Sequence, residues 1–431
     1  MTFVEVIEIA KSSATKRALY FRAILLVIAL VLIRTAAELW GVQFRAESHK
    51  LLDFDGFYIA GQLVWLGTIE KAYHFVTMFQ LEKSLSSSDA YQPWTYPPQF
   101  DLLVAPLALM PLGLAYCVFM IGTLAAYLAT LRRIAAENFV PVLILLVPVI
   151  VITIRCGQNG FLTGTLIGLT CIGLQTGRSL AGLPLGLMII KPHLAVGFAV
   201  YTLVNRRWGT ALVAAMTVAA TSALATVLLG PAVWTAFLDG VTEARVFLEH
   251  GFYPFFRMIS LYAVVRTFGF SALVATTAQV LVAIFALGMV FLASRQLSRR
   301  QSLGVAAIAT LLISPYAYDY DLLILGIGLG LLLPDLTDLG TERERLALYA
   351  LILFIGVFSI AQTVILSEPT SDKVIGEDMG LSLGGLALVS ILIISWRILR
   401  RSHERHAGRI EVCVKRSTHV HANPPPTATL A

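Results

Sequence analysis

Two aspartates among aromatic residues open a polar segment that directly follows a long apolar stretch. Asp53 and Asp55 stand in the sequence Leu-Asp-Phe-Asp-Gly-Phe-Tyr. Apolar surroundings raise the pKa of a carboxyl group toward neutrality, so either aspartate could act as a general base. Alternatively, Asp53 caps the helix that follows, because aspartate is a favoured capping residue. The spacing alone favours the cap.

Lys191 is the charged residue that is most difficult to place. It interrupts the apolar block 180–204 and stands two residues before His193. A lysine within the hydrocarbon of a membrane costs several kcal/mol unless it is paired. We therefore expect Lys191 either to form an ion pair with Asp319 or Asp321 or to bind an anionic ligand. In both cases its side chain lies inside the protein.

Other polar and aromatic residues stand in short segments between apolar blocks. The rings of Trp94 and Tyr96 suit a belt at the membrane interface, which is the simpler interpretation, or stacking on a sugar ring. Asp319 and Asp321 could ligate a metal, but no third ligand stands at a fixed spacing, and we predict no metal site. The remaining candidates for contacts with a ligand are Tyr58, Arg155, Gln158, Asn159, Arg257, Tyr320 and Asp321.

The composition excludes most classes of protein. Hydrophobic residues make up 57% of the 431 residues and charged residues only 13%, and the mean hydropathy is +0.79. In an ordinary soluble domain roughly a quarter of all residues are charged. Disordered chains show the opposite balance, and membrane β-barrels lack long apolar runs. The sequence therefore predicts an all-α integral membrane protein.

The apolar blocks predict about 12 transmembrane helices, or ten on a second interpretation. The count depends on the blocks 180–204 and 303–333, which are either single crossings or hairpins with a polar tip. Two hairpins place more Lys and Arg on the side of both termini, as the positive-inside rule requires. The predicted organisation is then a cytoplasmic segment 1–22, a membrane domain 23–398 with a large first outer loop at about 41–112, and a disordered basic cytoplasmic tail 399–431.

Several short motifs, taken in this order, resemble those of glycosyltransferase family 87, and the resemblance covers about residues 50–335. The motifs are Asp53-Phe54 with Phe57-Tyr58, Tyr96-Pro97-Pro98, Pro106-Leu107-Ala108, Gly157-Gln158-Asn159, Lys191-Pro192-His193, and Ser314-Pro315 with Tyr320-Asp321. The family includes bacterial mannosyltransferases of GT-C fold that use polyprenyl-phosphate mannose. The resemblance implies an enzyme of a bacterial-type inner membrane whose active site faces the periplasm or the exterior.

The resemblance also implies roles for particular residues. Asp53 matches the acidic position of the family motif and becomes the expected base, with Asp55 in reserve. Lys191 matches a Lys-Pro motif and would bind the phosphate of a polyprenyl-phosphate donor. The residues expected to assist Lys191 are Arg155, Arg257 and His193. A hexose, with mannose as the expected sugar, would pass with inversion to a lipid or glycan acceptor. Because fixed cations serve the phosphate, no cofactor is implied, although some GT-C relatives use a divalent metal.

Two other functions are compatible with parts of the sequence. A transporter or flippase of lipid-linked sugars would place its polar site near the midplane between internal repeats. No convincing repeat is found, and the acidic residues gather near one boundary, which favours the enzyme. A membrane scaffold would leave Lys191 unexplained. No nucleotide-binding fingerprint occurs, and no nucleic-acid partner is expected. Several relatives carry a histidine in the Ser-Pro tip, where this chain has Tyr316, Tyr318 and Tyr320, so the acceptor could differ.

Overall fold

Helices form all the regular structure of the described chain. The computed structural model describes residues 5, 7, 8, 13–45, 49–86, 91–366 and 380–401, and no β-strand occurs among them. The all-α prediction is therefore confirmed for this part of the chain. The outer connection 367–379 and the part of the predicted tail that follows Arg401 lie outside the described residues.

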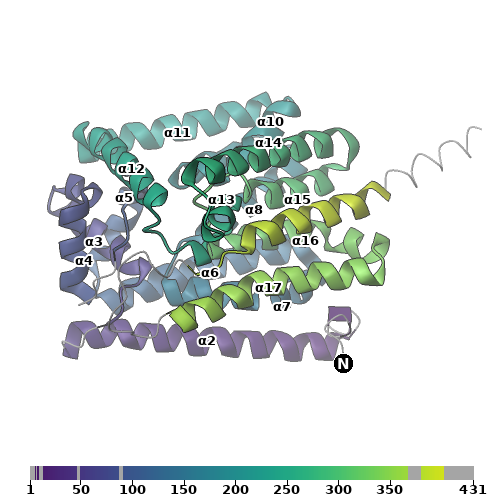
Figure 1. Ribbon diagram of the computed structural model, residues 1–431, viewed down its shortest axis with the longest axis horizontal. Helices are drawn as coiled ribbons and strands as arrows, with labels where there is room; N and C mark the ends of the chain where they lie inside the picture. The colour runs from purple at the N-terminus through teal and green to yellow at the C-terminus, as the bar shows by residue number, and fades with distance from the viewer. Residues whose placement is uncertain are drawn as a thin grey trace, which may run out of the picture.

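Most of the longer helices run side by side along one axis of the molecule (Figure 1). They are α2 (Ala14–Arg45), α6 (Leu112–Ala135), α7 (Phe139–Cys156), α8 (Gly160–Gln175), α10 (Val196–Val204), α11 (Trp208–Leu229), α14 (Ala272–Gln296), α15 (Arg299–Thr310), α16 (Leu323–Leu339), α17 (Glu342–Leu366) and a helix over 384–401. The short α9 (Gly182–Leu187) is flanked by the 3₁₀ helices η4 (Ser179–Ala181) and η5 (Met188–Ile190).

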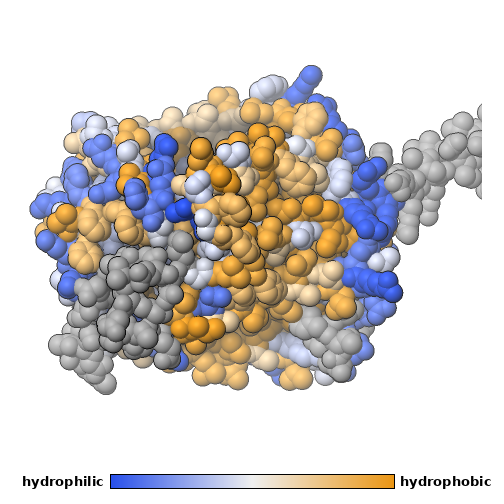
Figure 2. Space-filling model, in the orientation of Figure 1, coloured by the Kyte–Doolittle hydropathy of each residue, from blue (hydrophilic) through white to orange (hydrophobic). Residues whose placement is uncertain are grey.

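The surface of this bundle is that of a membrane protein. Figure 2 shows a hydrophobic band across the middle of the molecule and hydrophilic surfaces at both ends. Six stretches are long and apolar enough to cross a membrane: Ala14–Gly41, Leu112–Cys156, Trp208–Leu229, Ala272–Gln296, Asp319–Leu339 and Glu342–Leu366. The second of these stretches contains both α6 and α7, which η3 (Ala136–Asn138) separates. The count of about 12 crossings stays a prediction.

Both of the ambiguous apolar blocks reverse direction at a polar tip. Gly177 lies beside Arg207, and Gly209 beside Ser179, so the chain returns after Lys191 to the end from which it started. In the second block, Arg300 near the start of α15 forms an ion pair of 2.7 Å with Asp335 near the end of α16. The connection between α15 and α16 therefore forms a tip at the end of the bundle opposite this ion pair, which is the end that carries Lys191.

Several further elements gather at one end of the bundle, on the left in Figure 1. They are α3 (Asp53–Trp65), η1 (Ile69–Tyr73), α4 (Phe75–Ser86), α5 (Pro98–Val104), η2 (Ala105–Leu109) and α12 (Ala232–His250). Three further short elements complete the description: η6 (Pro192–Leu194), η7 (Phe255–Arg257) and α13 (Leu261–Thr267). The polar tip between α15 and α16 ends in η8 (Asp319–Leu322).

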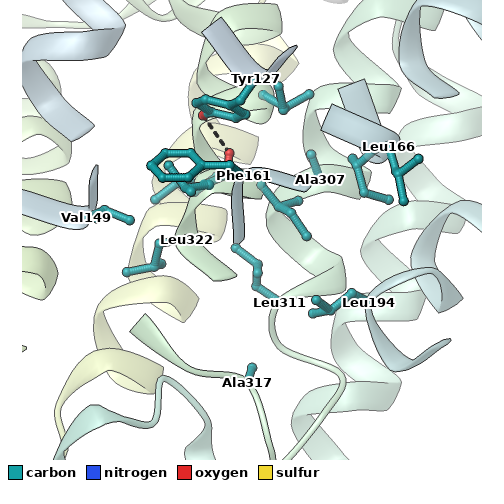
Figure 3. Close-up of a cluster of buried hydrophobic side chains, with 14 of the residues drawn as sticks. Tyr127, Val149, Phe161, Leu166, Leu194, Ala307, Leu311, Ala317 and Leu322 are labelled. Carbon is teal, nitrogen blue, oxygen red and sulfur yellow. Dashed lines mark hydrogen bonds between the residues drawn. The ribbon is translucent and has the colours of Figure 1, made fainter. Parts of the chain in front are cut away.

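The core between the helices is apolar and closely packed (Figure 3). Phe161 of α8 packs against Tyr127 of α6, with ring centres 5.8 Å apart, and the Tyr127 hydroxyl donates a hydrogen bond of 2.9 Å to the carbonyl of Leu323. This bond satisfies the one polar atom that Tyr127 brings into the core. It also ties α6 to the start of α16, and therefore to the tip that carries Asp319 and Asp321.

Gly160 allows α8 to begin directly against this tip. A Cβ atom at Gly160 would overlap the backbone carbonyl of Tyr320. We expect Gly160→Ala to lower the free energy of unfolding by about 1–3 kcal/mol, the usual cost of overpacking. Thermal unfolding of the purified protein in detergent measures the effect. The matched control is Gly288→Ala in α14, because no heavy atom lies within 4 Å of a Cβ there. Equal losses in both variants would contradict the close contact.

Candidate active site

A cavity of about 1040 Å³ lies at the end of the bundle that carries α3, α4 and α12. Segments that are far apart in the sequence form its wall: the start of α3, α4, residues 91–97, the turn between α7 and α8, the tip at Lys191, α12 and the segment after it, and the tip between α15 and α16. Its charged and amide residues are Asp53, Gln92, Gln158, Lys191 and Arg257. Most other wall residues are aromatic.

Asp53 is the first residue of α3 and faces this cavity. Its Oδ1 accepts a hydrogen bond of 2.8 Å from Gln92 Nε2 and lies 3.9 Å from Nη1 of Arg257. Burial raises the pKa of Asp53 above its usual value, and the charge of Arg257 opposes that shift. The carboxylate is therefore a stronger base than an exposed aspartate, and the cation keeps its ionised form accessible.

Asp55 has a different role from Asp53. Its Oδ2 accepts hydrogen bonds of 2.8 Å from the backbone N–H of Leu52 and 2.8 Å from Nε2 of His49. Asp55 therefore caps α3 and is fully buried outside the cavity wall. The cap that the spacing favoured for Asp53 belongs to Asp55, because Leu52 is the N-cap residue and Asp55 is the third residue of the helix.

Lys191 is buried at the tip between η5 and η6, where it faces the cavity. Its Nζ donates a hydrogen bond of 2.9 Å to Oδ1 of Asp321 and lies 4.5 Å from the ring centre of Tyr320. Of the two partners that the sequence offered, the structure selects Asp321. An ammonium group has three N–H donors, so this pair leaves donors for a ligand.

Arg257 is held by the other aspartate of the tip. Its Nε and Nη2 donate hydrogen bonds of 3.2 Å each to the two carboxylate oxygens of Asp319. The hydroxyl of Ser359 in α17 also donates to Asp319. A guanidinium held through two of its nitrogens is fixed in orientation. The third nitrogen, Nη1, has the 3.9 Å contact with Asp53 and points to the cavity side.

The two cations lie near the same aromatic ring. Cζ of Arg257 lies 5.6 Å from the ring centre of Tyr320, and Nζ of Lys191 lies 4.5 Å from the same centre. Each cation has its own buried aspartate partner, whereas Asp53 shares Arg257. The cavity thus combines one basic carboxylate with two fixed cations. Such a set can take a proton from a hydroxyl and stabilise an anionic leaving group.

Gln158 reaches the cavity through a turn that needs a glycine. Gly157 ends α7 with a φ of +70°, a left-handed conformation that glycine adopts without strain. The side-chain oxygen of Gln158 accepts a hydrogen bond of 3.0 Å from the Tyr96 hydroxyl. This bond fixes Tyr96, whose ring centre lies 5.9 Å from Nζ of Lys191. Gln158 and Tyr96 therefore belong to the cavity wall, and their contact with a ligand stays a prediction.

Some of the other predicted site residues line the cavity and some lie elsewhere. Trp94, Tyr320 and His193 line it, and the Trp94 ring nitrogen donates a hydrogen bond of 2.9 Å to Asp101. Arg155 lies elsewhere, because its Nη1 donates to Glu38 of α2 at 2.8 Å. The residues that the structure places outside the cavity wall are Asp55, Tyr58, Arg155, Asn159 and Asp321, of which Asp321 contacts the cavity through Lys191. The hydroxyl of Tyr58 donates a hydrogen bond to the backbone carbonyl of Met110.

Sequence reasoning missed two partners of the site, Gln92 and Ser359. Glu82 holds Gln92 in place on the side away from the cavity, because its carboxyl group accepts a hydrogen bond of 3.1 Å from the backbone N–H of Gln92. Burial raises the pKa of Glu82 to about 8, so this carboxyl group is mostly protonated at pH 7 and adds little negative charge behind Asp53. No pattern in the sequence distinguishes Gln92, next to Pro93-Trp94, from an ordinary loop residue. Among the described residues, no group of three or more His, Cys, Asp or Glu could hold a metal ion.

Comparison with known proteins gives one family. A sequence model of glycosyltransferase family 87 matches residues 94–315, which is 222 of the 431 residues and just over half of the chain. The match includes Lys191 and Arg257 and begins after Asp53. No curated protein and no solved structure matches the chain.

Proposed function

The chain belongs to glycosyltransferase family 87 and is a glycosyltransferase of a membrane, and from that premise we propose its substrates and mechanism. The donor is a polyprenyl phosphate that carries a hexose, with mannose as the expected sugar. The acceptor is a hydroxyl group of a lipid or glycan. The observation that carries this proposal is the meeting of Asp53, Lys191 and Arg257 at one cavity.

Asp53 acts as the general base. Its carboxylate takes the proton of the acceptor hydroxyl while the hydroxyl oxygen attacks the anomeric carbon of the donor. The bond between that carbon and the phosphate oxygen breaks, and its electron pair leaves with the polyprenyl phosphate. Attack from the side opposite the phosphate inverts the anomeric configuration. Gln92 holds the carboxylate in place through its 2.8 Å hydrogen bond.

Lys191 and Arg257 bind the donor phosphate and stabilise the negative charge that grows on it as the bond breaks. Their aspartate partners fix both cations before the donor arrives, so little reorganisation is needed. His193 lines the same cavity and is a candidate for a further contact with the phosphate. Arg155 has no part in this mechanism, because it is paired with Glu38 outside the cavity.

The active-site end of the bundle faces the periplasm or exterior in this proposal, with about 12 crossings and both termini on the cytoplasmic side. Basic residues at the opposite end support that orientation under the positive-inside rule. They include Arg299, which donates to the carbonyl of Gln175, and Arg401, which pairs with Glu344 at 2.7 Å. A transporter is not retained, because the family transfers sugars.

The decisive experiment supplies the purified protein with polyprenyl phosphates that carry radiolabelled mannose, glucose or arabinose, together with a membrane lipid extract as acceptor. We expect release of polyprenyl phosphate and labelling of an acceptor with at least one donor, mannose first. The control offers GDP-mannose as donor. Transfer from the nucleotide sugar, with none from any polyprenyl phosphate, would overturn the proposal.

The rate should depend on pH through Asp53. A base must be ionised, so kcat/KM for the donor should fall as the pH falls through the pKa of Asp53, which lies above the usual aspartate value. Removing the charge in Arg257→Gln should raise that pKa further and shift the acid limb of the profile to higher pH. Loss of donor binding alone would lower the rate equally at every pH and would not move the profile. An unshifted acid limb would therefore argue against electrostatic contact between Arg257 and Asp53.

A further inference from the structure

Four tyrosines form a cluster in the cavity beside the charged residues: Tyr91, Tyr253, Tyr316 and Tyr318. They come from the segment after α4, the segment after α12, and the tip between α15 and α16. The rings of Tyr253 and Tyr316 stand 6.0 Å apart at 80°. All four side chains are half-buried, so they contact the protein on one side and the cavity on the other.

The positions of these rings are fixed by their surroundings. The segment after α12 is joined to the tip by a hydrogen bond of 2.9 Å from the N–H of Ile259 to the carbonyl of Ala317. Tyr91 packs edge-on against Phe75, with ring centres 4.6 Å apart, and against Phe247 at 5.7 Å. A ligand would therefore meet rings that are already in place, which lowers the entropic cost of binding.

The four tyrosines line the cavity, and their hydroxyl groups form no hydrogen bond with the described part of the protein. The more deeply buried Tyr116 and Tyr127 each donate to a backbone carbonyl, at 2.7 Å and 2.9 Å. Burial and the nearby phenols of Tyr318, Tyr316 and Tyr91 raise the pKa of Tyr253 well above its usual value. The phenols are thus neutral, close to one another, and available as donors and acceptors.

We propose that this tyrosine cluster is the acceptor subsite and that it binds a pyranose ring. Aromatic faces pack against the C–H face of such a ring, and the unpartnered phenols would bond its hydroxyl groups. A hydrocarbon chain would cover those phenols without giving them hydrogen-bond partners, which costs free energy. The acceptor is therefore a glycan or the sugar headgroup of a glycolipid. This acceptor role rests on the proposed function.

The cluster is continuous with the charged part of the cavity. Tyr318 stacks on Tyr320 with ring centres 5.3 Å apart and an angle of 9° between the planes. The ring centre of Tyr318 also lies 5.9 Å from Cζ of Arg257, which contacts Asp53. A pyranose bound at the cluster therefore lies next to the base that would take its proton.

Saturation-transfer NMR on the full chain in nanodiscs, without donor, tests the subsite. The probes are the methyl α-pyranosides of mannose, glucose and galactose, with cyclohexanol as an apolar ring of the same size. We compare the wild type with the double variant Tyr253→Phe/Tyr316→Phe, which keeps both rings and removes two hydroxyls. The control is Tyr349→Phe in α17, which lies outside the cavity wall. Thermal unfolding checks that all variants are folded.

We expect at least one pyranoside to bind the wild type and the control, and its affinity to fall about tenfold or more in the double variant. Cyclohexanol should give no comparable signal. Absence of binding by all three pyranosides, equal binding by the double variant, or equal signals from cyclohexanol would each overturn the subsite. Because no donor is present, such a failure is separate from a failure to release polyprenyl phosphate, which tests the proposed function.

Discussion

Replacing Asp53 by Asn is expected to slow sugar transfer by roughly 100- to 10,000-fold, the usual contribution of a general base. Asparagine has nearly the same shape, and its amide oxygen can still accept the hydrogen bond from Gln92 that Oδ1 of Asp53 accepts at 2.8 Å. It cannot take a proton at neutral pH. The variant also removes a negative charge 3.9 Å from Arg257, so affinity for the anionic donor should not fall. Single-turnover release of polyprenyl phosphate and equilibrium binding of the donor measure the two quantities.

Asp55→Asn is the matched control, two residues away in the same helix. Asp55 accepts the N–H of Leu52 and the ring nitrogen of His49, and it does not line the cavity. Its replacement should lower the free energy of unfolding by about 1 kcal/mol, the typical value of a helix cap. Transfer per folded molecule should persist. Full turnover by Asp53→Asn, together with loss of turnover in Asp55→Asn, would exchange the roles of the two residues.

The roles of these two aspartates depend on where α3 begins. Sequence patterns locate a helix start only to within one or two residues. The spacing favoured a cap by Asp53, which would require the helix to begin after it. In the structure Leu52 is the N-cap residue, so Asp53 lies on the first turn facing the cavity and Asp55 accepts the Leu52 N–H. A shift of one residue thus separates a base from a cap.

The cost of burying a charge was a more reliable guide. It predicted that Lys191 lies inside the protein and is paired or bound, and the structure pairs it with Asp321 at 2.9 Å. The choice between Asp319 and Asp321 was beyond the sequence, because both stand on one short 3₁₀ turn. It depends on Arg257, 62 residues away, which approaches Asp319. Polar residues also marked the two positions where the chain reverses, although the sequence left a single crossing open for each block.

Adjacency in sequence was misleading for Arg155. It stands next to the turn that carries Gln158, and it was expected to assist Lys191 at the donor phosphate. Arg155 is still part of the last turn of α7, on the face that packs against α2, where it contacts Thr35 and Glu38. Three residues later the chain has passed Gly157, whose left-handed conformation turns the backbone toward the cavity. Arg155 and Gln158 therefore face different sides of the bundle, because α7 packs one face against α2, and the sequence alone does not show which face that is.

Replacing Lys191 by Met is expected to weaken donor binding by about 10- to 100-fold, the value of one hydrogen bond to a charged group. The same change leaves Asp321 buried without its cation, which should lower the free energy of unfolding by about 3–5 kcal/mol. A loss of donor binding could therefore follow from a damaged fold. Donor binding has to be separated from stability before Lys191 can be assigned to the phosphate.

The double variant Lys191→Met/Asp321→Asn makes this separation. It removes both charges, so no unpaired ion stays buried, and the amide can still accept the Tyr318 N–H that lies 3.0 Å from Oδ2 of Asp321. Stability should recover most of the loss, because the cost came from the lone carboxylate. Donor affinity should stay low, because the phosphate still lacks its cation. If the double variant binds donor as tightly as the wild type, Lys191 serves only its ion pair, and Arg257 alone is left to hold the phosphate.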